Sequence, residues 1–463
     1  MQSLATAWNK LLRKASNTTI AGKKILCAYN ALVDCQVFLS RKQLAEAARK
    51  ASFPPTEPAK VTSDEELANE LMLCFAQGKA GHKPTTNEFA STLPKKFPRH
   101  ARKLGGQAGI ISSQLSRLGA TTVLYTPNRP LETFKLLHEK VLFPTTTTNG
   151  ELVLESARNA CRKSDPQKTN WILEFSKGQS VRAHDRIVSC PRSNRLILAT
   201  PFPGTPSFDE ETMKVLPQLG KKIDCVVLAG HHYLLPKYDN GKTFDYYLKL
   251  EERAIKALKK GNRRLRAHLE FVPFPCQEIQ ESVVKHATKN FDSLGLNEVE
   301  ALQLAGKASH GTPKQESASL LYESALAILR ETRIQRVHVH APGLQVIVLR
   351  KPCAVPPEKA RNAALFASLA ATTKARVGRE FSAAEMQATT RKPVSARGLK
   401  QLIEFATENK LPKKFCLEGI AEFGDHYALV IPSQFQEKSN GTVGLGDVLS
   451  GCAFAAETPA SAP

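Results

Sequence analysis

The segment 443–451 constrains this chain more than any other part of its 463 residues. Gly444 and Gly446 permit a tight turn, and Asp447 follows at the start of a run of small residues that is typical of a helix. Glycines before a helix expose N–H groups to an anion, and a carboxylate in the same turn can accept a proton from an alcohol. The pattern suits transfer of a phosphoryl group to a hydroxyl. A glycine turn whose acid only interacts with the helix dipole explains the motif as well, so other residues must decide.

The composition is that of a globular chain with a strong positive charge. Hydrophobic residues make up 42% and charged residues 23%, and the net charge is +22. So large a charge favours anionic partners. The basic residues are scattered, with no sustained run and no interleaved aromatic residues. We therefore expect small phosphorylated ligands and do not expect nucleic acid.

Cysteine usage and hydropathy indicate a cytoplasmic protein. The chain has ten cysteines, and no two form a Cys-x-x-Cys pair, which argues against zinc-ribbon and thioredoxin-type sites. Most lie in apolar runs, as buried thiols do in a reducing cytosol. The sequence shows neither a secretory signal nor an apolar stretch long enough to cross a membrane. We expect a monomer or a small homo-oligomer without membrane contact.

Short apolar strands alternate with helical segments along the chain. Strands are predicted at 24–30, 121–125, 170–175, 195–199, 223–229, 265–271, 336–340 and 345–349. This alternation indicates an α/β protein with a parallel sheet covered on both faces. Ligands of such sheets bind at the carboxyl ends of the strands. The polar residues there, which include Asp34, Glu270, His340 and Asp447, are therefore expected to share one site.

Nine short motifs occur in a fixed order. They lie at 29–34, 105–110, 125–127, 171–175, 191–195, 268–271, 296–298, 338–340 and 444–447. Each is weak alone, but the series resembles the ADP-dependent glucokinase/phosphofructokinase family of the ribokinase-like superfamily. The resemblance covers nearly the whole chain. It implies a single unit over 1–463, with a three-layer α/β/α core and a discontinuous smaller lid. We expect the lid to come from segments near 36–60, 80–100 and 165–200.

The resemblance also implies an activity and roles for individual residues. A kinase of this kind transfers the β-phosphoryl group of Mg-ADP to a hexose or hexose phosphate and releases AMP. Asp447 would be the general base, and the backbone of Gly444, Leu445 and Gly446 the anion hole. The metal-binding positions would be Glu270, Glu298 and Asp447. Sugar contacts would be Asn30, Asp34, Gly106, Gln107 and Asn170. Nucleotide contacts would be Arg195, Asn297 and His340.

Each of these residues also has a structural interpretation. Glu270 could pair with a neighbouring arginine, and Glu298 could serve only the start of a helix. His340 could be a core histidine of an apolar strand, and Asp34 could be a turn-forming acid.

Two departures bear on the acceptor. Glucose-specific relatives carry a glutamate near the position of His82 and a histidine near the position of Asn170. Their loss weakens the glucose hypothesis, and loss of the acid removes repulsion against a substrate phosphate. Because Lys177, Arg182 and Arg192 are nearby in the sequence, we favour fructose 6-phosphate.

A second hypothesis belongs to another class of protein. The altered positions His82 and Asn170 allow a catalytically reduced member that acts as a basic sugar-phosphate or nucleic-acid binding protein. The presence of Asp447, Glu270 and Glu298 argues against it, because a pure binder needs no base and metal acids together. The residues alone do not separate ADP from ATP as donor. The chain has no GxxxxGK[ST] phosphate loop.

Overall fold

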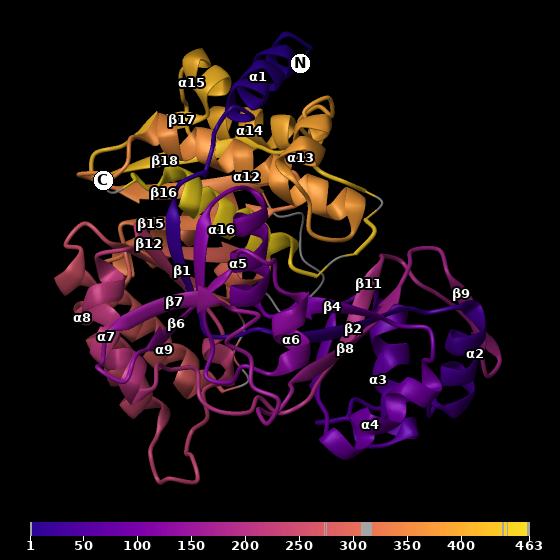
Figure 1. Ribbon diagram of the computed structural model, residues 1–463. Helices are drawn as coiled ribbons and strands as arrows, with labels where there is room; N and C mark the ends of the chain where they lie inside the picture. The colour runs from indigo at the N-terminus through magenta and orange to yellow at the C-terminus, as the bar shows by residue number, and fades with distance from the viewer. Residues whose placement is uncertain are drawn as a thin grey trace.

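The computed structural model describes residues 2–272, 274, 276–306, 317–437, 439–441 and 443–460. They form a large domain built on an eleven-stranded sheet and a small domain built on a five-stranded sheet. Figure 1 shows the small domain at one side of the large domain, in the colours of the first half of the chain. The predicted fold class, an α/β core with a second, smaller domain, is confirmed.

The large sheet holds six of the eight strands predicted from the sequence, and the predicted strands 170–175 and 195–199 lie in the small sheet. In spatial order its strands are β17 (Ile420–Glu422), β18 (His426–Pro432), β16 (Leu344–Arg350), β15 (Arg336–Ala341), β14 (Ser293–Asn297), β13 (Arg266–Glu270), β12 (Cys225–Leu228), β1 (Lys24–Ala28), β5 (Thr121–Tyr125), β6 (Leu142–Thr146) and β7 (Leu152–Ser156). From β15 to β6 neighbouring strands are parallel. The remaining pairs are antiparallel. The short turn between β15 and β16 permits only that direction.

Helices cover both faces of this sheet. They are α1 (Gln2–Ala15), α5 (Gln107–Arg117), α6 (Leu131–Leu136), α7 (Glu210–Gly220), the 3-10 helix η1 (His231–Tyr233), α8 (Phe244–Gly261), α9 (Gln277–Asn290), α10 (Glu298–Leu304), α11 (Ala318–Glu331), α12 (Pro357–Val377), α13 (Ala383–Thr389), α14 (Ala396–Glu408), α15 (Lys413–Glu418) and α16 (Leu445–Glu457). α16 packs against α12 and α5, and α8 packs against α7 and α9. At Gly451 an added Cβ would lie 2.7 Å from Cγ2 of Ile111, so a glycine is needed for α16 to approach α5.

The small domain is a sheet with helices on one face. Its strand order is β3 (Gly81–Pro84), β11 (Asn194–Ala199), β8 (Thr169–Phe175), β2 (Leu32–Phe38) and β4 (Ala101–Gly105). The other elements are α2 (Arg41–Lys50), α3 (Asp64–Gln77), α4 (Asn87–Lys96) and the hairpin of β9 (Ser180–Ala183) and β10 (Arg186–Ser189). Parts of the three segments near 36–60, 80–100 and 165–200 lie in this domain, and their role as a lid stays a prediction. α3 belongs here too, because Leu67, Leu71 and Phe75 are buried in the separate core of this domain.

Successive residues in the strands of the small sheet point to opposite faces, so that apolar side chains gather on one face and polar side chains on the other. On β2, Val33, Cys35 and Val37 lie in the core beneath the helices, so Asp34 and Gln36 point to the opposite face. Strand register adds further polar residues to that face. Asn170 and Lys103 pair with Asp34, Arg195 pairs with Glu174, and His82 pairs with Ile197. The small domain therefore presents a polar sheet face without helices.

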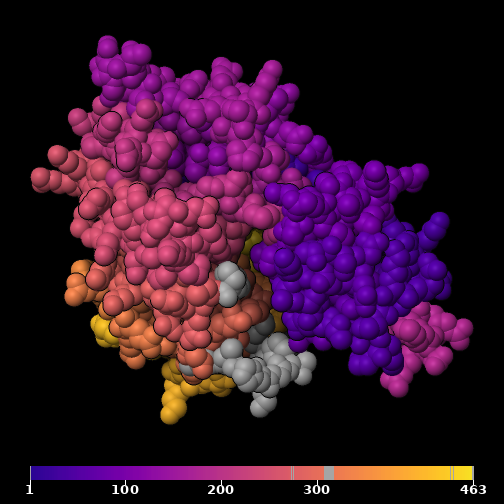
Figure 2. Space-filling model, turned by 90° about the horizontal axis from the view of Figure 1, so that it is seen from below, coloured from indigo at the N-terminus to yellow at the C-terminus, as the bar shows by residue number. Residues whose placement is uncertain are grey.

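The polar face turns toward the large domain. The chain enters the small domain after β1, returns at α5, enters again before β8 and returns after β11. Viewed from below, a furrow separates the indigo part of the small domain from the rest, and residues of the C-terminal part of the chain are visible inside it (Figure 2). Among the described residues, no helix is long and apolar enough to cross a bilayer.

Candidate active site

The start of α16 forms a narrow cradle of backbone groups. Its N-cap, Gly444, has φ 73°, a left-handed conformation that glycine adopts without strain, and no side chain caps the helix. A Cβ on Gly444 would lie 2.8 Å from Cδ1 of Ile110, and one on Gly446 would lie 2.8 Å from Cε1 of His340. The free N–H groups of this first turn are available to an anion. The predicted anion hole therefore has a backbone geometry that fits the role.

Asp447 lies half-buried in this first turn, between groups from three other elements. Desolvation raises the pKa of its carboxyl, while Lys374 of α12, Gln107 of α5 and Arg195 of β11 lower it. Although the Gln107 side chain lowers the pKa of Asp447, neither of its polar atoms has a hydrogen-bond partner of ordinary geometry among the described residues. The two cations favour the carboxylate, which is the form that a general base requires.

Arg195, which belongs to the small domain, also lies near Asp447. Burial lowers the pKa of its guanidinium, and the negative charges of Glu174, Asp447 and Asp34 raise it. Glu174 and Asp34 lie on the same sheet face as Arg195, whereas Asp447 belongs to the large domain. A phosphate placed above the start of α16 would therefore meet Arg195 from the opposite side of the furrow.

The predicted sugar-binding residues lie where β2, β8 and α5 meet. Asp34 is 5% exposed, and its Oδ1 accepts a hydrogen bond from Nδ2 of Asn170 at 3.2 Å. Oδ1 of Asn30 accepts from the backbone N–H of Ala108 at 3.0 Å and so fixes the start of α5. A Cβ on Gly106 would lie 2.7 Å from the carbonyl oxygen of Asn30, so only a glycine fits there. The predicted sugar-binding residues therefore lie together, and Asn30 also holds the backbone at the start of α5.

Burial raises the pKa of Asp34 to about 7. Asn170 and Lys168 act in the opposite direction, and the nearby charge of Asp447 adds to the rise. Desolvation likewise lowers the pKa of Lys168 to about 7, although Asp34 raises it. Near neutral pH this part of the site is poised between charged and neutral forms, so a polar ligand can fix its protonation.

Carboxylates gather on the other side of Asp447. Glu270 is buried, and its Oε2 lies 3.1 Å from Nε2 of His268. The pKa of Glu270 is raised well above its usual range by burial, and further by Asp447 and Glu300. Burial raises the pKa of Glu300 to about 8, and Asp447 and Glu298 add to that rise. Such mutual repulsion fits a position that a cation would stabilise.

The donor chemistry suits Mg²⁺ held mainly through water and phosphate. Among the described residues, no three His, Cys, Asp or Glu side chains converge closely enough to hold a metal by themselves. Mg²⁺ prefers oxygen ligands, keeps several waters and commonly uses only one or two carboxylates together with substrate phosphates. The oxygens of Glu270 and Glu300 therefore fit a Mg-nucleotide better than a permanently bound ion.

Glu300 was not identified from the sequence, although a signal for it exists. Asn297 and Glu300 form a capping box, in which Oδ1 of Asn297 accepts from the N–H of Glu300 at 2.9 Å and Oε2 of Glu300 accepts from the N–H of Asn297 at 2.7 Å. The spacing Asn-x-x-Glu before a helix predicts that box. Glu298, chosen from the sequence, is half-buried in the same turn. The metal role of Glu298 and the nucleotide role of Asn297 stay predictions.

His340 lines the cradle as an uncharged group. Its ring lies against Gly446, and burial lowers its pKa to about 4. A neutral ring beside a phosphate-binding turn can contact a nucleotide without adding charge.

Comparison with known proteins agrees with this geometry. The family model described as "ADP-specific Phosphofructokinase/Glucokinase conserved region" matches residues 23–456. The chain belongs to this family. It is 29% identical to an ADP-specific phosphofructokinase of Methanosarcina acetivorans, over 93% of this chain and 92% of that protein. It is 25% identical to an ADP-dependent glucose/glucosamine kinase of Pyrococcus furiosus, over 97% and 98%.

A solved structure supports the same assignment. A structure titled "ADP-dependent kinase complex with fructose-6-phosphate and ADPbetaS" superposes with a TM-score of 0.86, at 29% identity and over 98% of each chain. This chain is therefore an ADP-dependent sugar kinase by family. Its sequence is similar both to phosphofructokinases and to a glucose/glucosamine kinase of this family.

The first prediction for this family member concerns Asp447. In Asp447→Asn the general base is lost while the shape is kept. We expect kcat to fall by about 10²–10⁴, the usual range for general base catalysis, with nucleotide affinity changed by only a few-fold. Steady-state kinetics and calorimetry measure the two quantities. A variant that keeps near wild-type kcat would show that Asp447 is not the base.

The second prediction concerns the cost of burying Asp34. Because its folded pKa of about 7 exceeds its ordinary value of 3.8, its ionisation lowers the free energy of unfolding as pH rises. Asp34→Asn removes this loss of stability, because an amide does not ionise. We expect the ligand-free variant to gain stability over wild type by about 2–3 kcal/mol between pH 5 and pH 8.

Chemical unfolding across this pH range measures the gain, and Asp64→Asn is a matched control. The pKa of Asp64 is lowered, chiefly by its hydrogen bond with Lys96, so its replacement should bring no gain at pH 8. A pH-independent difference between wild type and Asp34→Asn would contradict the assignment.

Proposed function

We propose that this enzyme transfers the β-phosphoryl group of Mg-ADP to fructose 6-phosphate, giving AMP and fructose 1,6-bisphosphate. The acceptor hydroxyl would lie between Asp34 and Asp447, and Asp447 would take its proton. The N–H groups at the start of α16 and the Arg195 guanidinium would hold the oxygens of the transferring group. Glu270 and Glu300 would hold Mg²⁺, which neutralises phosphate charge when bound.

The observation that carries the choice of acceptor is the position of Lys168. Its side chain is 2% exposed, and its Nζ lies 5.0 Å from the centroid of the Tyr233 ring. That Nζ also donates to the carbonyl of Thr200. Among the described residues, no carboxylate forms an ion pair with Lys168. A buried ammonium of this kind is better matched by a dianionic phosphate than by a neutral sugar.

Two histidines near Lys168 are kept uncharged by burial, which lowers the pKa of His82 to about 4 and that of His232 well below its usual range. Asp34 is the nearby acid. His82 lies on the edge strand β3, on the same sheet face as Arg195 and Asn170. His232 is half-buried near Lys168, and its Nδ1 has no hydrogen-bond partner among the described atoms. A glutamate at the position of His82 would repel a sugar phosphate, and this chain lacks one. Relatives named as phosphofructokinases, such as that of Methanosarcina acetivorans, support the same choice.

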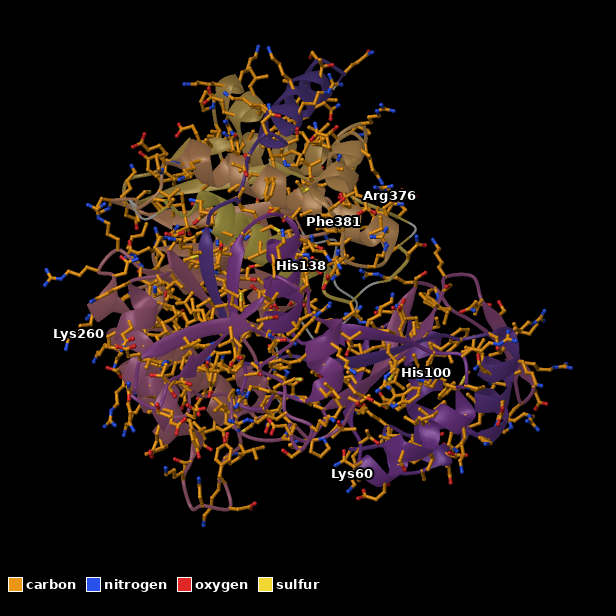
Figure 3. The ribbon with its side chains drawn as sticks, viewed as in Figure 1. Lys60, His100, His138, Lys260, Arg376 and Phe381 are labelled. Atoms are coloured by element: carbon orange, nitrogen blue, oxygen red, sulfur yellow. The ribbon has the colours of Figure 1, made fainter. Side chains whose placement is uncertain are left out.

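The binding-protein hypothesis has less support. Asp447, Glu270 and Glu300 are all present and mutually close, which a pure binder would not need. The sequence shows no sustained basic run either. Lys60 on the small domain and Lys260 on the large domain lie well apart (Figure 3). Oligonucleotide binding that is lost steeply with salt, without any AMP formation, would favour this alternative.

The third prediction tests the acceptor directly. Purified enzyme is mixed with Mg-ADP and either fructose 6-phosphate or glucose, with Mg-ATP as the control donor, and AMP is measured. We expect AMP with fructose 6-phosphate and much less with glucose. Equal turnover of glucose would contradict the specificity, and no AMP with either sugar would contradict the proposed activity.

The fourth prediction assigns the sugar phosphate to Lys168. Lys168→Met should raise the KM for fructose 6-phosphate by about 10- to 100-fold, the usual worth of one hydrogen bond to a charged group, with a smaller effect on the KM for ADP. Lys163→Met, an exposed lysine in the preceding loop, should leave both constants unchanged. An equal effect of both substitutions would overturn the assignment.

A further inference from the structure

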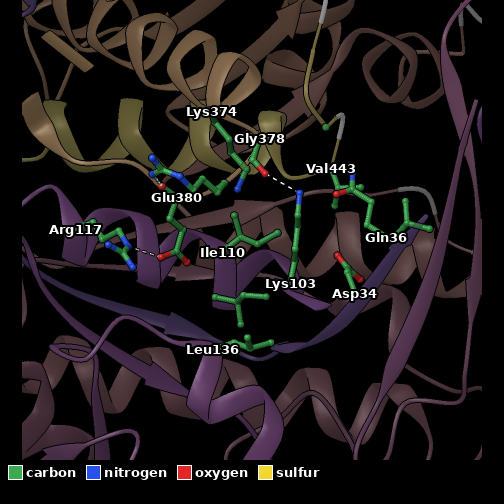
Figure 4. A pocket seen from close by; sticks show the side chains of 14 residues that line it. Asp34, Gln36, Lys103, Ile110, Arg117, Leu136, Lys374, Gly378, Glu380 and Val443 are labelled. Carbon is green, nitrogen blue, oxygen red and sulfur yellow. Dashed lines mark hydrogen bonds and ion pairs between the residues drawn. The ribbon is translucent and has the colours of Figure 1, made fainter. Parts of the chain in front are cut away.

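We propose that Lys374 is a catalytic residue of this enzyme, whose ammonium binds the transferring phosphoryl group beside the backbone cradle of α16. This inference rests on the proposed phosphoryl transfer. It adds a residue that lies outside all of the sequence motifs. It starts from a cavity of about 250 Å³ between the two domains (Figure 4). Of the site residues predicted from the sequence, only Asp34 lines it.

Lys374 comes from a helix far from the motif in sequence. It lies in the last turn of α12, which packs along α16. Its Nζ lies 3.3 Å from the point that a Cβ on Gly444 would occupy. Gly444 is the residue at which the free N–H groups of α16 begin. The ammonium is therefore beside the predicted anion hole, and the absence of a side chain on Gly444 leaves room for it.

Charged groups on four elements act on Lys374, and most already have partners. Asp447 of α16, Asp34 of β2 and Glu380 after α12 are negative, and Lys103 of β4 is positive. Arg117 holds Glu380 with an N–O distance of 2.6 Å, and Asn170 donates to Asp34. Lys374 itself forms no hydrogen bond or ion pair with a described residue. Burial lowers its pKa, as expected of an ammonium without a close anion.

A second lysine in the same cavity provides the contrast. Nζ of Lys103 donates to the carbonyl oxygen of Gly378 at 2.7 Å, a contact between the two domains (Figure 4). That ammonium is already satisfied, whereas the ammonium of Lys374 is not. The proposed reaction supplies a partner for the Lys374 ammonium, namely an oxygen of a phosphoryl group bound in the cradle.

The position of Lys374 also suits catalysis. Lys374 and Arg195 approach Asp447 from different elements, one in each domain. A phosphoryl group on its way to the acceptor would pass between these two cations. Fixed positive charges that face the transferring oxygens stabilise the transition state without reorganisation.

The experiment compares Lys374→Met, Lys374→Arg and the control Lys103→Met, each confirmed as folded by its thermal transition. Calorimetry gives the affinities for ADP and AMP, which differ by the β-phosphate, and steady-state assays give kcat. For Lys374→Met we expect a loss of about tenfold in ADP affinity, an unchanged AMP affinity and a kcat lower by about 10². Lys374→Arg should restore part of both, and Lys103→Met should keep the wild-type ratio of ADP to AMP affinity.

The outcomes separate this inference from its alternatives. An equal loss of ADP and AMP affinity, or a ratio that Lys103→Met changes as strongly, would show that Lys374 only supports the fold and would overturn the proposal. An unchanged affinity ratio with kcat within about threefold of wild type would overturn it as well. Because nucleotide binding is measured without a sugar, a wrong acceptor assignment would leave the test of Lys374 intact.

Discussion

The site depends on a half-buried carboxylate whose pKa is raised by burial, while cations from both domains act to lower it. Asp447 begins α16, where backbone N–H groups are free, and burial alone would favour its protonated form. Arg195 reaches it from the small sheet and Lys374 from α12. The electrostatics of the base therefore require both domains in place, which couples the chemistry to the position of the small domain.

The small domain can serve this purpose because one face of its sheet has no helices. The alternation along β2, β8 and β11 puts apolar residues into a separate core and polar residues toward the large domain. Each domain thus carries part of the proposed site. The predicted sugar contacts Asp34 and Asn170 lie on the small sheet, and the predicted base and metal acids lie on the large domain. Closing the furrow would also exclude water, which competes with the sugar as acceptor.

Much of this arrangement was predictable from the sequence, and the exceptions have physical reasons. The apolar strands and the turn at 444–447 carry strong local signals, and the α/β class followed from them. The spacing of Leu67, Leu71 and Phe75 predicts a buried face for α3, but not that this face packs in the core of the small domain. Glu298 was chosen from the resemblance, and the nearness of Glu300 to Glu270 and Asp447 is a tertiary arrangement that the motif around Glu298 does not reveal. Lys374 lies in the last turn of α12, a largely buried helix, and only its packing against α16 reveals its place.

The most direct test of this account is a crystal structure of Asp447→Asn with Mg-ADP and fructose 6-phosphate. The account predicts the acceptor hydroxyl within hydrogen-bond distance of residue 447, with the β-phosphate on the N–H groups of α16 and between Arg195 and Lys374. It predicts the sugar phosphate on Lys168. A β-phosphate held away from the start of α16, or an acceptor hydroxyl that faces neither residue 447 nor the β-phosphorus, would contradict it.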